Sequence, residues 1–146
     1  MKFSFLFLMA GLLGFTPNLE SNKKMVQFKI TNIRDANKGN FVICIFNNSS
    51  NYQNGTTCIR KEVAKDRVRN KELTFSIAMP EGVYGAVLLD DENLNDEMDY
   101  GILLPKEGFG FSNHVPMIRK PQFHDFDFTV SNQSTNQPIL IKVKYM

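Results

Sequence analysis

Tryptophan is absent from this chain of 146 residues, and cysteine and histidine occur only twice each. The cysteines, Cys44 and Cys58, are fourteen positions apart, and neither histidine lies at ligand spacing from them, so no zinc site is predicted. In an oxidising compartment the two thiols could form a disulfide bridge, and otherwise they pack as two small buried hydrophobic groups. Both alternatives stay open.

An excess of charge of one sign is also missing. Seventeen Lys and Arg residues face fifteen Asp and Glu residues, which leaves a formal net charge of +2. A balance this small gives no ground for a nucleic-acid partner. The length predicts one domain, which can bury about two thirds of the unfolded chain's surface.

No apolar run is long enough to span a membrane. The longest, from Phe3 to Phe15, has thirteen residues, and a spanning helix needs about 20. Lys2 precedes the run and Pro17 follows it, an order typical of a signal peptide. We therefore predict a signal peptide over residues 1–20 and a secreted or periplasmic protein with no transmembrane segment after cleavage. The cleavage site is not fixed, since no A-x-A tripeptide follows, and a membrane anchor or a buried N-terminal helix are the alternatives.

The remaining chain alternates apolar and polar residues at the period of β-strands, without a convincing amphipathic helix. The pattern predicts an all-β fold, a single antiparallel β-sandwich of about seven strands over residues 25–146. The expected strands cover residues 25–30, 41–46, 58–63, 73–77, 84–89, 122–130 and 139–145.

One segment, residues 90–99, breaks the apolar rhythm with six carboxylates in ten residues. Counting from Asp91, oxygen-bearing side chains fall at positions one, three, five and nine, which is the spacing of calcium loops of the EF-hand type. Clustered carboxylates also repel one another unless a cation is present. We predict a Ca²⁺ site formed by the side chains of Asp91, Asn93, Asn95 and Asp99 and the backbone carbonyl of Glu97.

Two positions weaken this match to an EF-hand loop. Position six, where those loops have glycine, is Asp96, and position twelve, where they have a bidentate Glu, is Ile102. The alternative is therefore an acidic hairpin loop without an ion.

A second segment alternates glycine and phenylalanine from Gly108 to Phe111. It lacks the strand-to-helix context of a phosphate-binding loop. We expect Phe109 and Phe111 to pack against the sandwich and Gly108 or Gly110 to adopt a positive φ.

Catalytic residues are not predicted. Ser112 could combine with His114 or His124 and with Asp125, but the G-x-S-x-G sequence of a nucleophile elbow is absent.

Several of these motifs together resemble a bacterial secreted family, domain of unknown function 2141. The family pattern is roughly H-D-E-N-G-N-G-x-x-D, then G-I-P-x-E-G-[YF]-G-F-S-N, then a P-x-F strand and a C-terminal strand. The matching residues are Leu89-Asp90-Asp91-Glu92-Asn93, Asn95, Asp99, Gly101-Ile102, the stretch 105–113, Pro121-Gln122-Phe123 and the ending 141–145.

This chain departs from the family pattern at three places. Asp90 replaces the usual His, Leu94 and Asp96 replace two loop glycines, and Leu103 and Leu104 are additional residues. The resemblance implies a prealbumin-like or immunoglobulin-like β-sandwich, export, no established activity, and a metal-binding role for the matched acidic loop.

The leading hypothesis is an exported, non-catalytic binding or structural module with a calcium-binding loop, whose partner is an unknown protein or glycan. A carbohydrate-binding module and a hydrolase with an atypical site are the alternatives. Sugar binding usually needs exposed aromatic residues, so the absence of tryptophan counts against it. A cleft that holds a histidine beside a carboxylate would favour the hydrolase.

Overall fold

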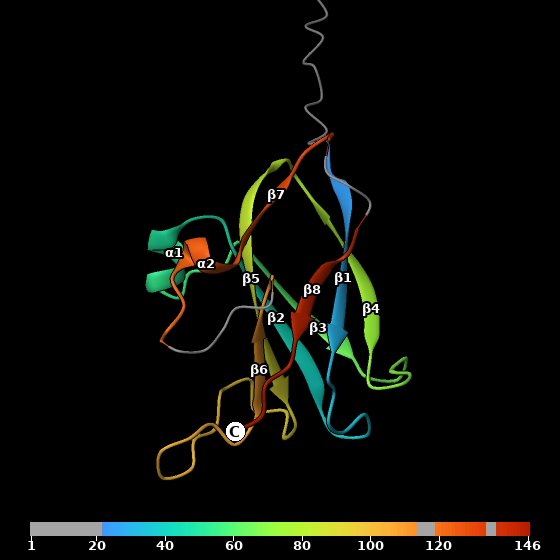
Figure 1. Cartoon of the computed structure of the whole chain (residues 1–146), viewed down its shortest axis with the longest axis vertical. Coiled ribbons are helices and arrows are strands. Elements are labelled where there is room, and N and C mark those ends of the chain that lie inside the picture. Colours follow the sequence, from blue (N-terminus) through green and yellow to red (C-terminus); the bar gives the residue numbers. More distant parts are fainter. Residues whose placement is uncertain (1–21, 114–118, 134–136) are drawn as a thin grey trace, which may run out of the picture.

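The computed structural model describes residues 22–113, 119–133 and 137–146, and these form two packed β-sheets with two short helices (Figure 1). The predicted signal peptide lies outside the described residues. The elements in chain order are β1 (Lys24–Thr31), β2 (Asn40–Phe46), α1 (Ser49–Gln53), β3 (Ile59–Ala64), β4 (Leu73–Met79), β5 (Gly82–Asp91), β6 (Gly108–Phe111), α2 (Phe123–Phe126), β7 (Asp127–Val130) and β8 (Ile139–Lys142). No helix in these three ranges is long and apolar enough to cross a membrane.

The predicted β-sandwich is confirmed. One sheet has three strands in the order β4-β1-β8, and the other has five, with the order β3-β2-β5-β6 and β7 paired to β5. The pairings are antiparallel, except that β8 runs parallel to β1 in the register Phe28↔Ile139 to Thr31↔Lys142. The chain crosses from β7 in the five-stranded sheet to β8 in the three-stranded sheet. There β8 runs in the same direction as its neighbour β1 (Figure 1).

The core lies between the two sheets, where the alternating patterns place their apolar residues. Strand β4 buries every second residue, from Leu73 to Met79. Phe28 lies at the centre of this core, stacked on Phe75 with ring centroids 5.4 Å apart and edge-on to Phe128 at 5.8 Å. In β4 the period of two therefore predicts correctly which face of the strand is dry.

The outer face of the five-stranded sheet is covered by the two helices. There Phe46, Phe123 and Phe126 form a second, smaller buried cluster, and Tyr52 from α1 packs edge-on to Phe126 at 5.0 Å. This cover explains why β2 is apolar on both faces, because strands covered on both sides lose the polar alternation.

The prediction of one continuous strand over residues 122–130 is wrong in its first half. Residues Phe123–Phe126 form α2, and the strand begins only at Asp127. The backbone N–H of Gln122 donates to Asp125 at 2.7 Å, which closes a helical capping turn. The helical spacing lets Phe123 and Phe126 enter the same cluster, whereas a strand would point them to opposite faces.

The expectation of a positive φ at Gly108 or Gly110 is also wrong, since both lie in the extended strand β6. They are glycine because the C-terminal chain passes too close for a side chain. A Cβ on Gly108 would lie 2.3 Å from Cε1 of Tyr145, and one on Gly110 would lie 2.7 Å from Cγ2 of Ile141. The expected packing of the phenylalanines holds for Phe111, whose ring centroid is 5.1 Å from that of Phe126.

Candidate functional site

The acidic loop leaves the sandwich at Asp91, the last residue of β5. The side chain of Asp91 is buried, with 1% of its surface exposed. Its two carboxylate oxygens accept hydrogen bonds from the backbone N–H groups of Asn95, at 3.1 Å, and Asp96, at 2.9 Å. The loop is therefore wrapped around its own first residue.

The other predicted ligand side chains join this arrangement. The amide groups of Asn93 and Asn95 both donate to the carboxylate of Asp99, the latter at 3.2 and 3.3 Å from its two oxygens. The side-chain oxygen of Asn93 accepts from the N–H of Asn95 at 3.1 Å, and that of Asn95 accepts from the N–H of Glu97 at 3.0 Å. The structure thus brings Asn93, Asn95 and Asp99 into direct contact, and Asp91 and Glu97 join them through the backbone of the loop.

Two residues in this loop adopt a conformation that glycine favours. Leu94 has φ 61° and Asp96 has φ 65°, and these are the two positions where the resembling family pattern has glycine. A left-handed conformation costs a residue with a Cβ roughly 1–2 kcal/mol. The loop therefore turns at Leu94 and Asp96 although neither residue is glycine, which adopts a positive φ most easily.

Two of the six carboxylates in residues 90–99, those of Glu92 and Asp96, form ion pairs with arginines from elsewhere in the chain. Arg34 Nη2 lies 2.8 Å from Glu92 Oε1, and Arg60 pairs with Asp96. The hydrogen bond to Glu92 is the main reason that the pKa of Arg34 is raised. Mutual repulsion of the carboxylates is therefore weaker than their number indicates, and Asp91 and Asp99 are the charged members of the candidate site.

These two carboxylates and two amides are a mixed donor set. In the described part of the chain, no three His, Cys, Asp or Glu side chains lie close enough together to hold a metal ion. The loop offers oxygen donors only, which are the ligands of a hard cation such as Ca²⁺ and not those of a zinc site.

Glu107 fastens both ends of the loop to the sandwich, and sequence analysis missed it. Its side chain is buried, and its two oxygens accept from the N–H of Glu92 at 2.9 Å and from the N–H of Asp99 at 3.3 Å. Its place in the E-G-F-G-F motif beside the loop is the signal that could have identified it. Glu107 thus links Glu92, which follows the first predicted ligand, to Asp99, the last one.

Beneath the loop lies a buried polar cluster that sequence analysis also missed. Lys65 and Asp90 form an ion pair whose side chains are 2% and 0% exposed. The hydroxyl of Tyr145 donates to the other oxygen of Asp90 at 2.6 Å. The ammonium group of Lys65 also donates to the carbonyl oxygens of Asp35, at 3.2 Å, and Lys38. Through Asp90, which precedes Asp91 on β5, the cluster links β5 to the β1–β2 connection and to the C-terminal segment.

Burial governs the proton affinities in this cluster. Desolvation raises the pKa of Asp90, although the hydrogen bonds from Lys65 and Tyr145 act in the opposite direction. Desolvation, followed by the hydrogen bond to Asp90, raises the pKa of Tyr145 well above its usual range. Tyr145 therefore acts as a hydrogen-bond donor.

Of the residues weighed for a hydrolase, the three that the structure describes, Ser112, His124 and Asp125, each contact other groups. Ser112 is fully buried, its hydroxyl donates to the carbonyl oxygen of Phe126, and the N–H of Ala86 donates to it at 3.0 Å. His124 is largely exposed and lies 3.9 Å from Asp127, while Asp125 pairs with Arg119 at 2.8 Å. His114 lies outside the described residues.

The two cysteines are free thiols in the structure, so it does not contain the bridge that was one of the two alternatives. Cys44 is half-buried on β2, and Cys58 is exposed, with its thiol 3.3 Å from the carbonyl oxygen of Ile45. Burial raises the pKa of both thiols. A bridge between them stays a prediction.

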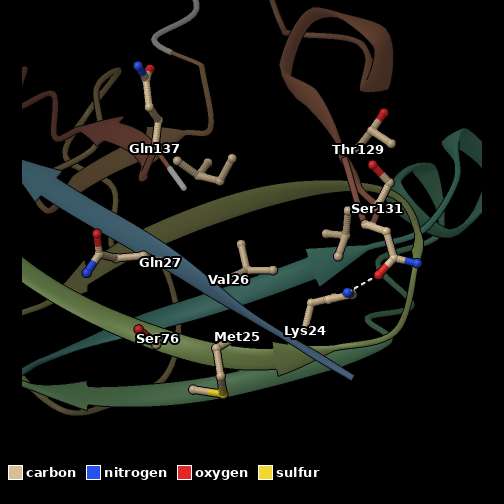
Figure 2. A pocket seen from close by; sticks show the side chains of 11 residues that line it. Lys24, Met25, Val26, Gln27, Ser76, Thr129, Ser131 and Gln137 are labelled. Atoms are coloured by element: carbon tan, nitrogen blue, oxygen red, sulfur yellow. Dashed lines mark hydrogen bonds between the residues drawn. The ribbon is translucent and has the colours of Figure 1, made fainter. Parts of the chain in front are cut away.

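A cavity of about 520 Å³ lies at the opposite end of the sandwich (Figure 2). Strand β5 separates the two sites, since it begins at Gly82, paired with Val130 in the cavity wall, and ends at Asp91. Lys24 lies in the wall of the cavity and donates to the side-chain oxygen of Asn132. No His, Cys, Asp or Glu is among the described residues that line this cavity, so its lining supplies no carboxylate.

Comparison with known sequences supports the motif analysis. The profile of a family described as "Uncharacterized protein conserved in bacteria (DUF2141)" matches residues 28–138. The chain belongs to this family. The matched span of the DUF2141 domain includes the acidic loop, Glu107 and strand β6. No curated protein and no solved structure matches the chain significantly.

Proposed function

We propose that this DUF2141 protein is an exported, non-catalytic binding or structural module whose loop 91–99 binds Ca²⁺. The observation that carries the proposal is the mutual contact of Asn93, Asn95 and Asp99 over a loop that is wrapped around the carboxylate of Asp91. The four side chains are all oxygen-bearing and come from positions one, three, five and nine of a single turn.

The donor set suits calcium better than a smaller cation. Ca²⁺ takes six to eight oxygen ligands in flexible geometry, whereas Mg²⁺ demands a near-ideal octahedron and keeps its waters. Four side chains and the Glu97 carbonyl leave room for water molecules. Binding requires the amides of Asn93 and Asn95 to present their oxygens, which takes a rotation about one terminal bond each.

Only Asp91 and Asp99 carry charge in this set, so we expect weak binding. A dissociation constant on the order of 10⁻⁴ to 10⁻³ M is typical of extracellular calcium modules. Export, which we propose from the apolar segment 3–15, would place the loop where such a site is useful. The intact mass of the exported protein should lack this segment, and a cytoplasmic species that begins at Met1 would contradict export.

A calorimetric titration tests the calcium proposal. The parent should bind one Ca²⁺ with sub-millimolar to millimolar affinity and bind Mg²⁺ at least tenfold more weakly. Asp99→Asn should abolish the heat, since it removes one of two charges without a change in size. Asp66→Asn, which removes an acidic residue from another loop, is the matched control and should bind like the parent. A parent protein without heat would overturn the proposal.

The alternatives have less support from the described residues. Buried Ser112, bonded to backbone groups, is a structural residue of the β5–β6–α2 junction. A carbohydrate-binding module needs a platform of exposed aromatic side chains, and Tyr100 is the one aromatic among the strongly exposed large apolar residues of the described ranges. We therefore propose no second candidate activity. The partner of the module is proposed only as an unknown protein or glycan.

A further inference from the structure

Beyond the acidic loop, the chain forms a small ordered hairpin over residues 99–106. The N–H of Lys106 donates to the carbonyl oxygen of Asp99 at 2.8 Å, and the N–H of Gly101 donates to the carbonyl oxygen of Leu104 at 2.7 Å. Between these two hydrogen bonds, Tyr100 and Pro105 form an antiparallel β-bridge. The hairpin projects away from the sandwich as the orange loop at the lower left of Figure 1. Its tip is thus held in shape by its own backbone and does not rest on the sheets.

The tip carries the most exposed apolar side chains among the described residues. Ile102 is 100% exposed, Leu103 is 88% exposed, and Leu104 and Tyr100 are more than half exposed. Ile102 and Leu103 occupy the two corner positions of the turn, where Gly, Pro, Asn, Asp and Ser are usual. Neither local conformation nor the core accounts for aliphatic residues there, and exposed apolar patches mark interaction sites.

The side chains along the hairpin follow the order of a membrane interface. Aliphatic residues form the tip, and Tyr100 and the exposed Lys106 follow on the two arms of the hairpin, farther from the tip. Tyrosine is enriched at the headgroup level of bilayers, and lysine extends its ammonium group from apolar surroundings to that level.

We propose that this hairpin inserts its tip, Ile102, Leu103 and Leu104, into the surface of a lipid bilayer. The tip is convex and small. Its three side chains and Tyr100 together offer on the order of 400 Å², about half of the roughly 800 Å² that each partner gives to a standard protein interface. A bilayer requires no matching surface, so a short apolar projection is sufficient. The inference goes beyond the calcium proposal and does not depend on it.

The absence of tryptophan from the chain makes a direct test simple. Leu103→Trp introduces a single tryptophan at the tip, and Leu140→Trp introduces one at a half-exposed position on β8. With phosphatidylcholine vesicles, the emission of the first variant should shift to shorter wavelength and that of the second should not. Emission of Leu103→Trp that is unchanged by vesicles overturns the proposal and leaves the tip to a protein partner.

Sedimentation with the same vesicles measures the contribution of the tip. Ile102→Ser/Leu103→Ser should reduce binding by about tenfold for each side chain removed, whereas Leu140→Ser should bind like the parent. Equal binding of the parent and the double variant would contradict insertion. Both substituted side chains are solvent-exposed, so thermal melting of the double variant should match the parent.

Calcium separates the two proposals. Binding to phosphatidylcholine should be equal with Ca²⁺ and with chelator, because insertion is an apolar effect. On vesicles that include phosphatidylglycerol, Ca²⁺ should increase binding through the loop 91–99. Loss of that increase in Asp99→Asn, with Leu103→Trp emission still shifted, supports both proposals. If Ca²⁺ does not increase vesicle binding of the parent, this counts against the calcium proposal and leaves the insertion proposal intact.

Discussion

The buried pair Lys65–Asp90 gives a quantitative test of how the loop is supported from below. Lys65→Met removes the cation but keeps most of the apolar length of the side chain. It leaves the carboxylate of Asp90 buried with Tyr145 as its remaining donor. Removing one partner of a buried pair costs about 3–5 kcal/mol, and the two carbonyl groups that Lys65 serves, on Asp35 and Lys38, add roughly 1 kcal/mol each.

The double variant Lys65→Met/Asp90→Leu separates these contributions. It removes both charges, and replacing a buried pair with apolar residues is often neutral or stabilising. The loss of hydrogen bonds to Asp35 and Lys38 remains, so the double variant should be about 1–2 kcal/mol less stable than the parent. It should therefore be more stable than the Lys65→Met single variant.

Urea unfolding, followed by far-ultraviolet circular dichroism, measures both variants. The control is Lys29→Met, which breaks the exposed Lys29–Glu72 pair of 2.7 Å and should cost less than about 1 kcal/mol. If Lys65→Met costs no more than this control, the pair does not hold the end of the sandwich together and the reasoning is refuted.

Three further predictions concern the same end of the molecule. Because burial raises the pKa of Asp90 above its ordinary 3.8, its proton binds the folded state more tightly. The stability that this proton adds should be complete below pH 3.8 and should be lost as the pH rises through the raised pKa of folded Asp90. The free energy of unfolding of Asp90→Asn, measured across the same pH range, should lack this pH dependence. Leu94→Gly should raise the melting temperature by relieving a positive φ, a gain of up to about 1 kcal/mol, and an unchanged or lower value would contradict the strain. Gly108→Ala should cost about 1–3 kcal/mol, because its Cβ meets the ring of Tyr145, whereas Gly101→Ala, with no neighbour nearer than 3.5 Å, should melt like the parent.

The architecture was predictable from the sequence where the pattern was local and regular. Alternation was sufficient to place β1 and β4, and in β4 also the buried face, whereas β5 was placed by its continuous apolar run. The pattern failed at Phe123 and Phe126, because phenylalanine suits both a strand and a helical turn, and a distant cluster with Phe46 decides between them. Strand β6 was missed because glycine alternates with phenylalanine in it. Glycine indicates a turn as readily as a close approach of two segments of the chain.

The candidate site shows the same division between local and distant information. Asp91, Asn93, Asn95 and Asp99 were identifiable, because a loop of this spacing places its own side chains together. The supports could not be found in this way. Tyr145 is 55 positions from the Asp90 carboxylate that it contacts, and only the folded chain brings such residues together.

Diffraction from a crystal grown with Ca²⁺ would show whether the oxygens of the acidic loop converge on one cation. A single anomalous peak is expected, with the side-chain oxygens of Asp91, Asn93, Asn95 and Asp99 about 2.3–2.6 Å away. The carbonyl oxygen of Glu97 should lie in the same shell. A loop without a peak, in which the amides of Asn93 and Asn95 still donate to Asp99, would contradict the calcium proposal.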